Sequence, residues 1–140
     1  MYNKIKSGYS FEEKQIFSES KLQQLALDCG DMNFIHHDVN KAKESRFGGI
    51  IASGSAISAI FSAMIPAHVS KITPMLGLEM SFKFPAPIRP NTELLMKWEV
   101  SGTEATSSAG IVVKLFGEIL DENSNILVTG VAKIILLPSL

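Results

Sequence analysis

The densest group of polar side chains lies in a ten-residue stretch, Cys29–Asp38, which reads Cys-Gly-Asp-Met-Asn-Phe-Ile-His-His-Asp. Asp31 and His36 are five residues apart, so in a loop that leaves a helix both side chains can reach the same small molecule. Histidine titrates near neutral pH, and a neighbouring carboxylate can orient it or exchange a proton itself. The stretch is therefore a candidate site for general acid–base catalysis.

Two other interpretations of this stretch stay open on spacing alone. An Asp-x-Asn sequence after a glycine is ordinary turn chemistry, in which Asn33 bonds its own backbone. A metal site is the second alternative, because carboxylates and imidazoles are common metal ligands. The possible ligands are Asp31, His36, His37 and Asp38. Adjacent histidines seldom point the same way and no second group of ligands is evident, so we expect no metal.

A helix is expected directly before the polar stretch. Ser18 is a candidate N-cap, and Ser20 with Gln23 has the spacing of a capping box. Apolar residues then recur at i, i+3, i+4 and i+7, namely Leu22, Leu25, Ala26 and Cys29. Gly30 stands where a helix-ending glycine is expected, so the polar stretch begins where this helix ends.

A second helix is predicted over residues 53–65, with Pro66 and Pro74 marking its exit. It is dense in small residues, so other backbone can approach it from several sides and a sheet can wrap around it. The apolar segment that contains it, residues 50–65, is interrupted by four serines. This segment is shorter than the roughly 20 residues that a membrane-spanning helix needs. We interpret it as a buried core helix.

The rest of the chain has the alternating pattern of strands, with a turn cluster at residues 121–125 before the last one. The expected strands cover residues 9–17, 80–84, 94–100, 111–119 and 126–137, and a short helix is expected near residues 40–44. The late, turn-linked strands predict an antiparallel sheet with one polar face. The predicted fold class is α+β, with a long central helix packed in a curved antiparallel sheet.

Composition narrows the classes of function. A chain of 140 residues, nearly half of them apolar, fits one domain over residues 1–140. Thirteen basic residues balance fourteen acidic ones, so we expect neither a nucleic acid nor an anionic membrane as partner. The only cysteine, Cys29, cannot form an internal disulfide, and the N-terminus lacks the apolar stretch of a signal peptide. We therefore expect a cytoplasmic protein.

Three features of the sequence follow one another: the motif Gly30-Asp31-x-Asn33-x-x-His36-x-Asp38, then Ala42 and Phe47, then Gly54 at the head of the small-residue helix. Together they resemble the signature of the MaoC-like dehydratases, which include the (R)-specific enoyl-CoA hydratases. The segments 81–85 and 90–92 are similar to the strand and turn that follow the helix in that family, so the resemblance covers nearly the whole chain. It implies the hot-dog fold, which agrees with the fold predicted from periodicity.

The resemblance also implies an activity. The enzyme would add water reversibly and syn to the double bond of a 2-enoyl thioester, giving an (R)-3-hydroxyacyl thioester, with no metal and no redox cofactor. Asp31 and His36 would handle the water, and we assign His36 as base and Asp31 as acid. The backbone N–H of Gly54 would bind the thioester oxygen, as the unpaired amides at a helix start can. Asn33, Ser53 and Ser62 complete the predicted site, although Ser62 could instead bond back to its own helix.

Partners follow from the same resemblance. The substrate would be an acyl thioester of CoA or of an acyl carrier protein, and the chain would form a homodimer or a dimer-based oligomer. Lys41, Lys43 and Arg46 could meet the phosphates of CoA, with a solvated surface patch as the alternative. His37 and His68 are expected to be solvated or structural.

The chain departs from the family pattern at two positions. Phe34 replaces the usual proline after the asparagine, which should alter the turn or a pocket wall. Ser53 replaces the usual histidine before Gly54; it could cap the helix, change the substrate or weaken activity. Cys29 fits a small-residue position of the motif and is expected to be buried and inert.

Two rival functions stay open. One is another hot-dog enzyme, a thioesterase or an acyl-carrier-protein dehydratase, which typically places a carboxylate on or beside the central helix. The absence of Asp and Glu between Glu44 and Glu79 counts against both. The other rival is a non-catalytic hot-dog domain that binds acyl thioesters or mediates assembly, and Ser53 is the residue that keeps it open.

Overall fold

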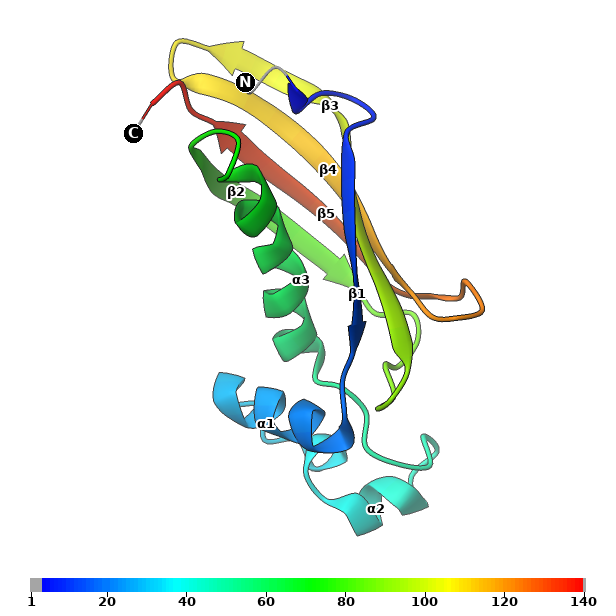
Figure 1. The fold of residues 1–140 in the computed structure, drawn as a ribbon. Helices are drawn as coiled ribbons and strands as arrows, with labels where there is room; N and C mark the ends of the chain where they lie inside the picture. The colour runs from blue at the N-terminus through cyan, green and yellow to red at the C-terminus, as the bar shows by residue number, and fades with distance from the viewer. Residues whose placement is uncertain (1–3, 140) are drawn as a thin grey trace.

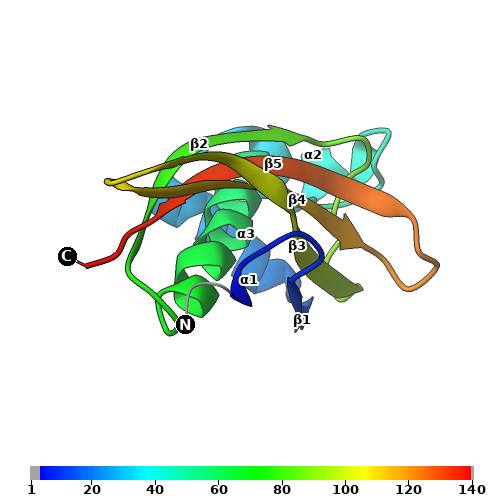
Figure 2. The same ribbon diagram turned by 90° about the horizontal axis from the view of Figure 1, so that it is seen from above.

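The computed structural model describes residues 4–139 and shows a curved five-stranded sheet with a long helix along its concave face (Figure 1). Seen from above, the sheet arches over helix α3 (Figure 2). The elements in chain order are β1 (Ser10–Ile16), α1 (Glu19–Cys29), the 3-10 helix η2 (Phe34–His36), α2 (Val39–Glu44), α3 (Gly54–Val69), β2 (Met75–Lys83), β3 (Glu93–Ser107), β4 (Gly110–Leu120) and β5 (Ile126–Leu136). The predicted α+β hot-dog architecture is confirmed.

The sheet is antiparallel throughout, with strand order β1-β3-β4-β5-β2. The two connections between β3, β4 and β5 are short hairpins, whereas β1 and β2 are the two edge strands. The pairing register shifts twice between β3 and β4, and once in each of the β4–β5 and β2–β5 pairs. Such bulges increase local twist and bend the strands, which accounts for a sheet curved enough to enclose a helix.

Trp98 on β3 fixes α3 against the sheet. Its ring is fully buried and stacks on Phe61 of α3, with ring centroids 4.4 Å apart. The indole N–H donates to the backbone carbonyl of Phe61 at 2.9 Å, so the buried donor is satisfied. A Cβ at Gly117 or Gly130 would approach this ring within 2.6–2.8 Å. The two glycines therefore make the space that the indole fills.

The predicted inward faces of β3 and β4 are confirmed. Leu94, Met96, Trp98 and Val100 are buried, as are Val113, Leu115 and Ile119, and Ile111 packs against the core from its margin. The alternation predicted at residues 80–84 is less regular. Phe82 contacts the core, whereas Met80 is exposed and Phe84 lies just beyond the end of β2.

Two local predictions about helix ends were wrong. Helix α3 does not end before Pro66 but continues to Val69. Proline at this position removes only the hydrogen bond to the Ser62 carbonyl, while Ile65 and Val69 hold the last turn in the core. Ser18 caps α1 as predicted, but Ser20 lies inside the helix rather than at its start.

The geometry of the α1 cap explains why Ser20 and Gln23 do not form the predicted capping box. Ser18 has the extended backbone of an N-cap, and its hydroxyl accepts from the N–H of Lys21 at 3.1 Å. Gln23 is thereby free of the cap, and its amide donates to the carbonyl of His37 at 3.3 Å. This bond ties α1 to the polar stretch.

Within residues 4–139, no helix combines the length and apolar composition needed to cross a membrane.

Candidate active site

The end of α1 sets the position of Asp31. Gly30 adopts the left-handed conformation (φ 80°), which is accessible to glycine at little cost. The N–H groups of Gly30 and Asp31 then bond to the carbonyls of Leu27 and Ala26, at 3.0 and 2.9 Å. The chain therefore turns sharply out of α1, and the Asp31 side chain lies at the first position after the turn.

Asn33 shapes the next turn and brings His36 back toward Asp31. Its side-chain oxygen accepts from the N–H of Ile35 at 3.4 Å, which caps η2, and its own N–H donates to Oδ1 of Asp31 at 3.2 Å. His36 is the last residue of η2 and is buried. The turn chemistry considered as an alternative is thus present, and it is what brings the acid and the imidazole together.

The two side chains meet directly. Nε2 of His36 lies 3.2 Å from Oδ2 of Asp31, and Nδ1 of His36 donates to the backbone carbonyl of Ile51 at 2.8 Å. The imidazole is 7% exposed and the carboxylate 23%, so the histidine is held inside the protein while the acid is partly open. A buried imidazole oriented by a backbone carbonyl and facing a carboxylate is suited to proton transfer.

Ser53 joins this pair from the start of α3. Its hydroxyl accepts from the N–H of Ala56 at 3.2 Å, as an N-cap does, and donates to Oδ2 of Asp31 at 2.5 Å. The Ser53 hydrogen bond is the main cause that lowers the pKa of Asp31 below its usual value. The Asn33 N–H and the charges of His36 and His37 act in the same direction, whereas burial opposes them.

A cavity of about 450 Å³ opens beside the dyad. His36 and Gly54, the first residue of α3, both border this space, whereas the residues that line it do not include Asp31 or Ser53. The remaining wall is mainly apolar and is formed by Asn33, Ile35, Arg46, Phe47, Ile51, Ala52, Ile57, Phe84, Pro85, Ala86, Pro87, Ile88 and Val128. An apolar pocket with a few converging polar groups at one end is the usual form of a small-molecule site.

The sequence model of the MaoC like domain matches residues 2–121. The chain belongs to this family. Solved structures with the same fold include the unliganded R-hydratase PhaJ1 of Pseudomonas aeruginosa, with a TM-score of 0.81 and 24% identity over 99% of this chain and 86% of that one. The (R)-hydratase of A. caviae superposes with a TM-score of 0.80 and 22% identity over 93% and 96% of the two chains.

A MaoC-like dehydratase of Rhodospirillum rubrum gives a TM-score of 0.83 and 21% identity over 99% of this chain and 97% of that one. The search of curated proteins gave no match. The family match confirms the resemblance seen in the sequence, and the superpositions confirm the hot-dog fold.

The other residues predicted for the site occupy different places in this MaoC-like domain. Ser62 lies two turns further along α3, where its hydroxyl donates to the carbonyl of Ala59 at 3.0 Å. The residues that line the cavity do not include it. His37 donates from Nε2 to the carbonyl of Asp31 at 2.7 Å, so it stabilises the loop. Arg46 lines the cavity and stacks on Phe47, while Lys41 and Lys43 are exposed on α2.

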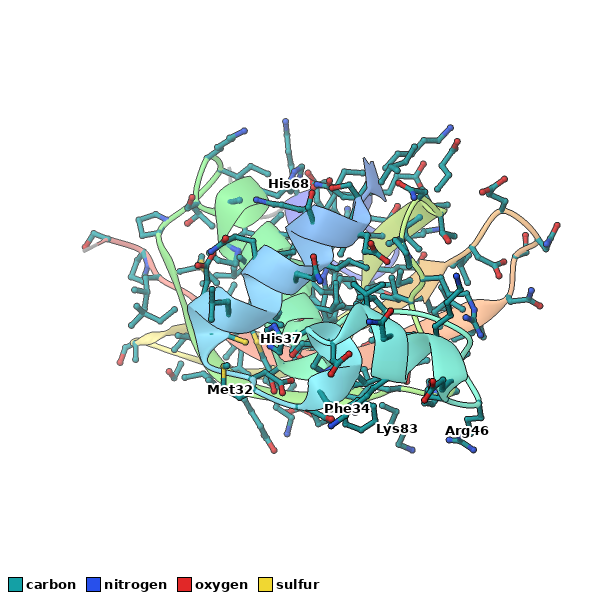
Figure 3. The ribbon with its side chains drawn as sticks, turned by 90° about the horizontal axis from the view of Figure 1, so that it is seen from below. Met32, Phe34, His37, Arg46, His68 and Lys83 are labelled. Atoms are coloured by element: carbon teal, nitrogen blue, oxygen red, sulfur yellow. The ribbon has the colours of Figure 1, made fainter. Side chains whose placement is uncertain are left out.

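His68 and Cys29 lie outside the dyad. His68 lies on the opposite side of the view from Phe34 in Figure 3, where Nε2 bonds to the hydroxyl of Tyr9 at 2.7 Å and the ring stacks on Phe11. This supports the structural role expected of it. The prediction that Cys29 is buried was wrong, because it is the last residue of α1 and lies beyond the buried face of that helix.

Sequence reasoning missed two contributors to the site. The carbonyl of Ile51 fixes the His36 ring, but a backbone acceptor leaves no signal in residue type. Phe84 covers Gly54, since a Cβ on that glycine would lie 3.3 Å from the phenyl ring. The pairing of a glycine at a helix start with a distant aromatic residue could be found only from the fold. Among the described residues, no cluster of three or more His, Cys, Asp or Glu side chains could hold a metal.

Proposed function

We propose that this MaoC-like domain is a hydro-lyase that adds water reversibly and syn to the α,β double bond of a 2-enoyl thioester, giving an (R)-3-hydroxyacyl thioester. One observation carries the proposal. The imidazole of His36 borders an apolar cavity and lies 3.2 Å from the carboxylate of Asp31, and the start of α3, where helix amides are unpaired, borders the same cavity. The activity named for the R-hydratases of similar fold supports the same conclusion.

The position of the two side chains supports syn addition. His36 borders the cavity and Asp31 contacts the imidazole from the same loop, so the water and the proton delivered to the α carbon would reach the same face of the double bond. Negative charge develops on the thioester oxygen as the water attacks the β carbon. The N–H of Gly54, at the positive end of α3, is the donor we assign to that oxygen.

The cavity wall suits an acyl chain. Ile57, Ile88 and Val128 provide apolar surface beyond Gly54, and Phe84 stands over the glycine itself. Arg46 is exposed and borders the same cavity, so its guanidinium is placed to meet the phosphates of CoA or of a carrier-protein prosthetic group. In Figure 3, Arg46 and Lys83 project along the same edge of the molecule as Phe34.

We further propose that the chain forms a homodimer, in the cytoplasm. β2 is an edge strand of the sheet, and its Leu76 and Leu78 are each 55% exposed. Edge strands with exposed apolar residues invite pairing with another chain, and symmetric dimers are the commonest outcome. The homodimer would cover this strand.

The test is incubation of purified protein with crotonyl-CoA, following loss of the enoyl absorbance and, in parallel, release of free thiol. We expect loss of absorbance without thiol release. Thiol release would indicate a thioesterase. Tight binding of the acyl-CoA without either reaction would indicate the non-catalytic alternative.

A further inference from the structure

Ser53 caps α3 with a hydroxyl that both accepts and donates a hydrogen bond. The oxygen accepts from the N–H of Ala56, and the hydrogen is directed to Oδ2 of Asp31 at 2.5 Å. The residue is 1% exposed, so water does not compete for either bond. An O–H···O⁻ bond of this length is in the range of charge-assisted hydrogen bonds.

The hydrogen bonds of His36 fix how many protons the dyad holds. A backbone carbonyl only accepts, so Nδ1, 2.8 Å from the carbonyl of Ile51, carries a proton. Nε2 then faces Oδ2 of Asp31 at 3.2 Å. Two bare lone pairs at this distance would repel each other, so one proton is shared between these two atoms. It lies either on the imidazole or on the carboxyl group.

The groups around Asp31 determine where that proton lies. Ser53 donates to Oδ2 and the N–H of Asn33 donates to Oδ1, so both carboxylate oxygens act as acceptors. The Ser53 bond is the largest contribution that lowers the pKa of Asp31, followed by the Asn33 N–H and the charges of His36 and His37, against the effect of burial. The Cys29 thiol, 4.0 Å from the Ser53 oxygen, is the other titratable group at this point.

We propose that Ser53 is a positioning residue for the dyad: its hydroxyl holds Oδ2 of Asp31 as an acceptor and places the shared proton on Nε2 of His36. In the hydration direction Asp31 is then the base and His36 the acid. This order is the reverse of the one assigned above from the family resemblance. The inference on acid and base rests on the proposed hydratase function, whereas the location of the proton does not.

Asp31 and His36 together account for every proton that is transferred in the reaction. Asp31 takes one proton from water, and the water oxygen bonds to the β carbon while the π electrons move onto the thioester oxygen near Gly54. The resulting enolate collapses as its α carbon takes the proton from Nε2 of His36. The proton now on Asp31 returns to Nε2 across the 3.2 Å contact, and the site is restored. The net change is the addition of one water molecule.

The decisive experiment is an NMR titration that needs no turnover. The ¹³C signal of the Asp31 carboxyl group, identified by its absence in Asp31→Asn, and the ¹⁵N signals of His36 are followed against pH in wild type and in Ser53→Ala. We expect the Asp31 midpoint to move to higher pH in Ser53→Ala, and Nε2 of His36 to be less protonated at neutral pH. An unchanged Asp31 midpoint would overturn the proposal.

Three further variants separate the hydrogen bond from the cap. Ser53→Gly removes the hydroxyl, yet glycine is tolerated at N-caps, so it replaces Ser53→Ala should that variant fail to fold. Ser53→Thr keeps the hydroxyl and should titrate as wild type does. Ser18→Ala removes the equivalent cap of α1, whose hydroxyl has no contact with Asp31, and should leave the Asp31 midpoint unchanged.

The pH profile of kcat/KM with crotonyl-CoA provides the link to catalysis. Because the base must be ionised, a higher Asp31 pKa in Ser53→Ala moves the acidic limb to higher pH, while the plateau falls by less than about tenfold. A limb that does not move would show that Ser53 acts only as a cap. If wild type turns over no enoyl thioester, the hydratase function fails, while the NMR titration still decides where the proton lies.

Discussion

The oxyanion donor can be tested at Gly54 by a pair of variants, Gly54→Pro and Gly54→Ala, of which only the second keeps the backbone N–H group. Gly54 is the first residue of α3, where the missing N–H of proline costs the helix nothing. The preceding residue, Ser53, has φ −70° and ψ 124°, which is the extended conformation that a following proline requires. Gly54→Pro should therefore fold while losing the proposed donor.

Gly54→Ala is the matched control. Both substitutions add a Cβ that would lie 3.3 Å from the ring of Phe84, which is 49% exposed and can shift by the small amount needed. Gly54→Ala thus controls for the added Cβ and keeps the N–H, whereas proline replaces the N–H by a ring carbon. Loss of one oxyanion-hole donor typically lowers kcat by about 10²–10³-fold, or roughly 3–4 kcal/mol.

The assay is steady-state hydration of crotonyl-CoA, with thermal unfolding to confirm that both variants fold. We expect kcat of Gly54→Pro to be about 10²-fold or more below that of Gly54→Ala. If the two variants have rates within tenfold of each other, the backbone N–H of Gly54 is not the donor and the role assigned to the start of α3 is wrong.

Three other predictions concern the dyad, the assembly and a distant histidine. Asp31→Asn and His36→Ala should each lower kcat by about 10²-fold or more in the same assay, and wild-type turnover in either would refute the dyad. Light scattering should show a dimer at micromolar concentration and more monomer in Leu78→Glu; active protein that is only monomeric would contradict the assembly. The pKa of His68 is lowered from 6.5, first by burial and then by Lys71. The neutral form is therefore favoured by folding, and stability should fall as pH drops below about 6.5. Thermal melts from pH 7 to 5 should show a smaller loss in His68→Gln, and equal losses would exclude this cause.

The fold and the dyad could be predicted from the sequence because both depend on local signals. The apolar period and Gly30 place the end of α1, and the five-residue spacing then brings Asp31 and His36 into one turn. Alternation in β3 and β4 likewise identifies the side chains that face α3. Each of these features depends only on residues that lie close together in the sequence.

The contacts that tune the site could not be predicted in the same way. Ser53 is 22 residues from Asp31, and their hydrogen bond depends on how the start of α3 crosses the turn after α1. The exposure of Cys29 and the continuation of α3 through Pro66 were mispredicted for a related reason. Residue type suggested a buried thiol and a helix end, but the packing around each position decided otherwise.

The most direct test of the central claim is hydration of crotonyl-CoA in D₂O, with NMR analysis of the product. Because Asp31 and His36 would deliver both parts of the water from one face of the double bond, the addition should be syn, and the proposed R-hydratase activity gives (3R)-hydroxybutyryl-CoA as the product. It should carry one deuterium at C2, added to the same face as the hydroxyl group. Deuterium on the opposite face would contradict the arrangement of the dyad, and a (3S) product would contradict the proposed R-hydratase activity.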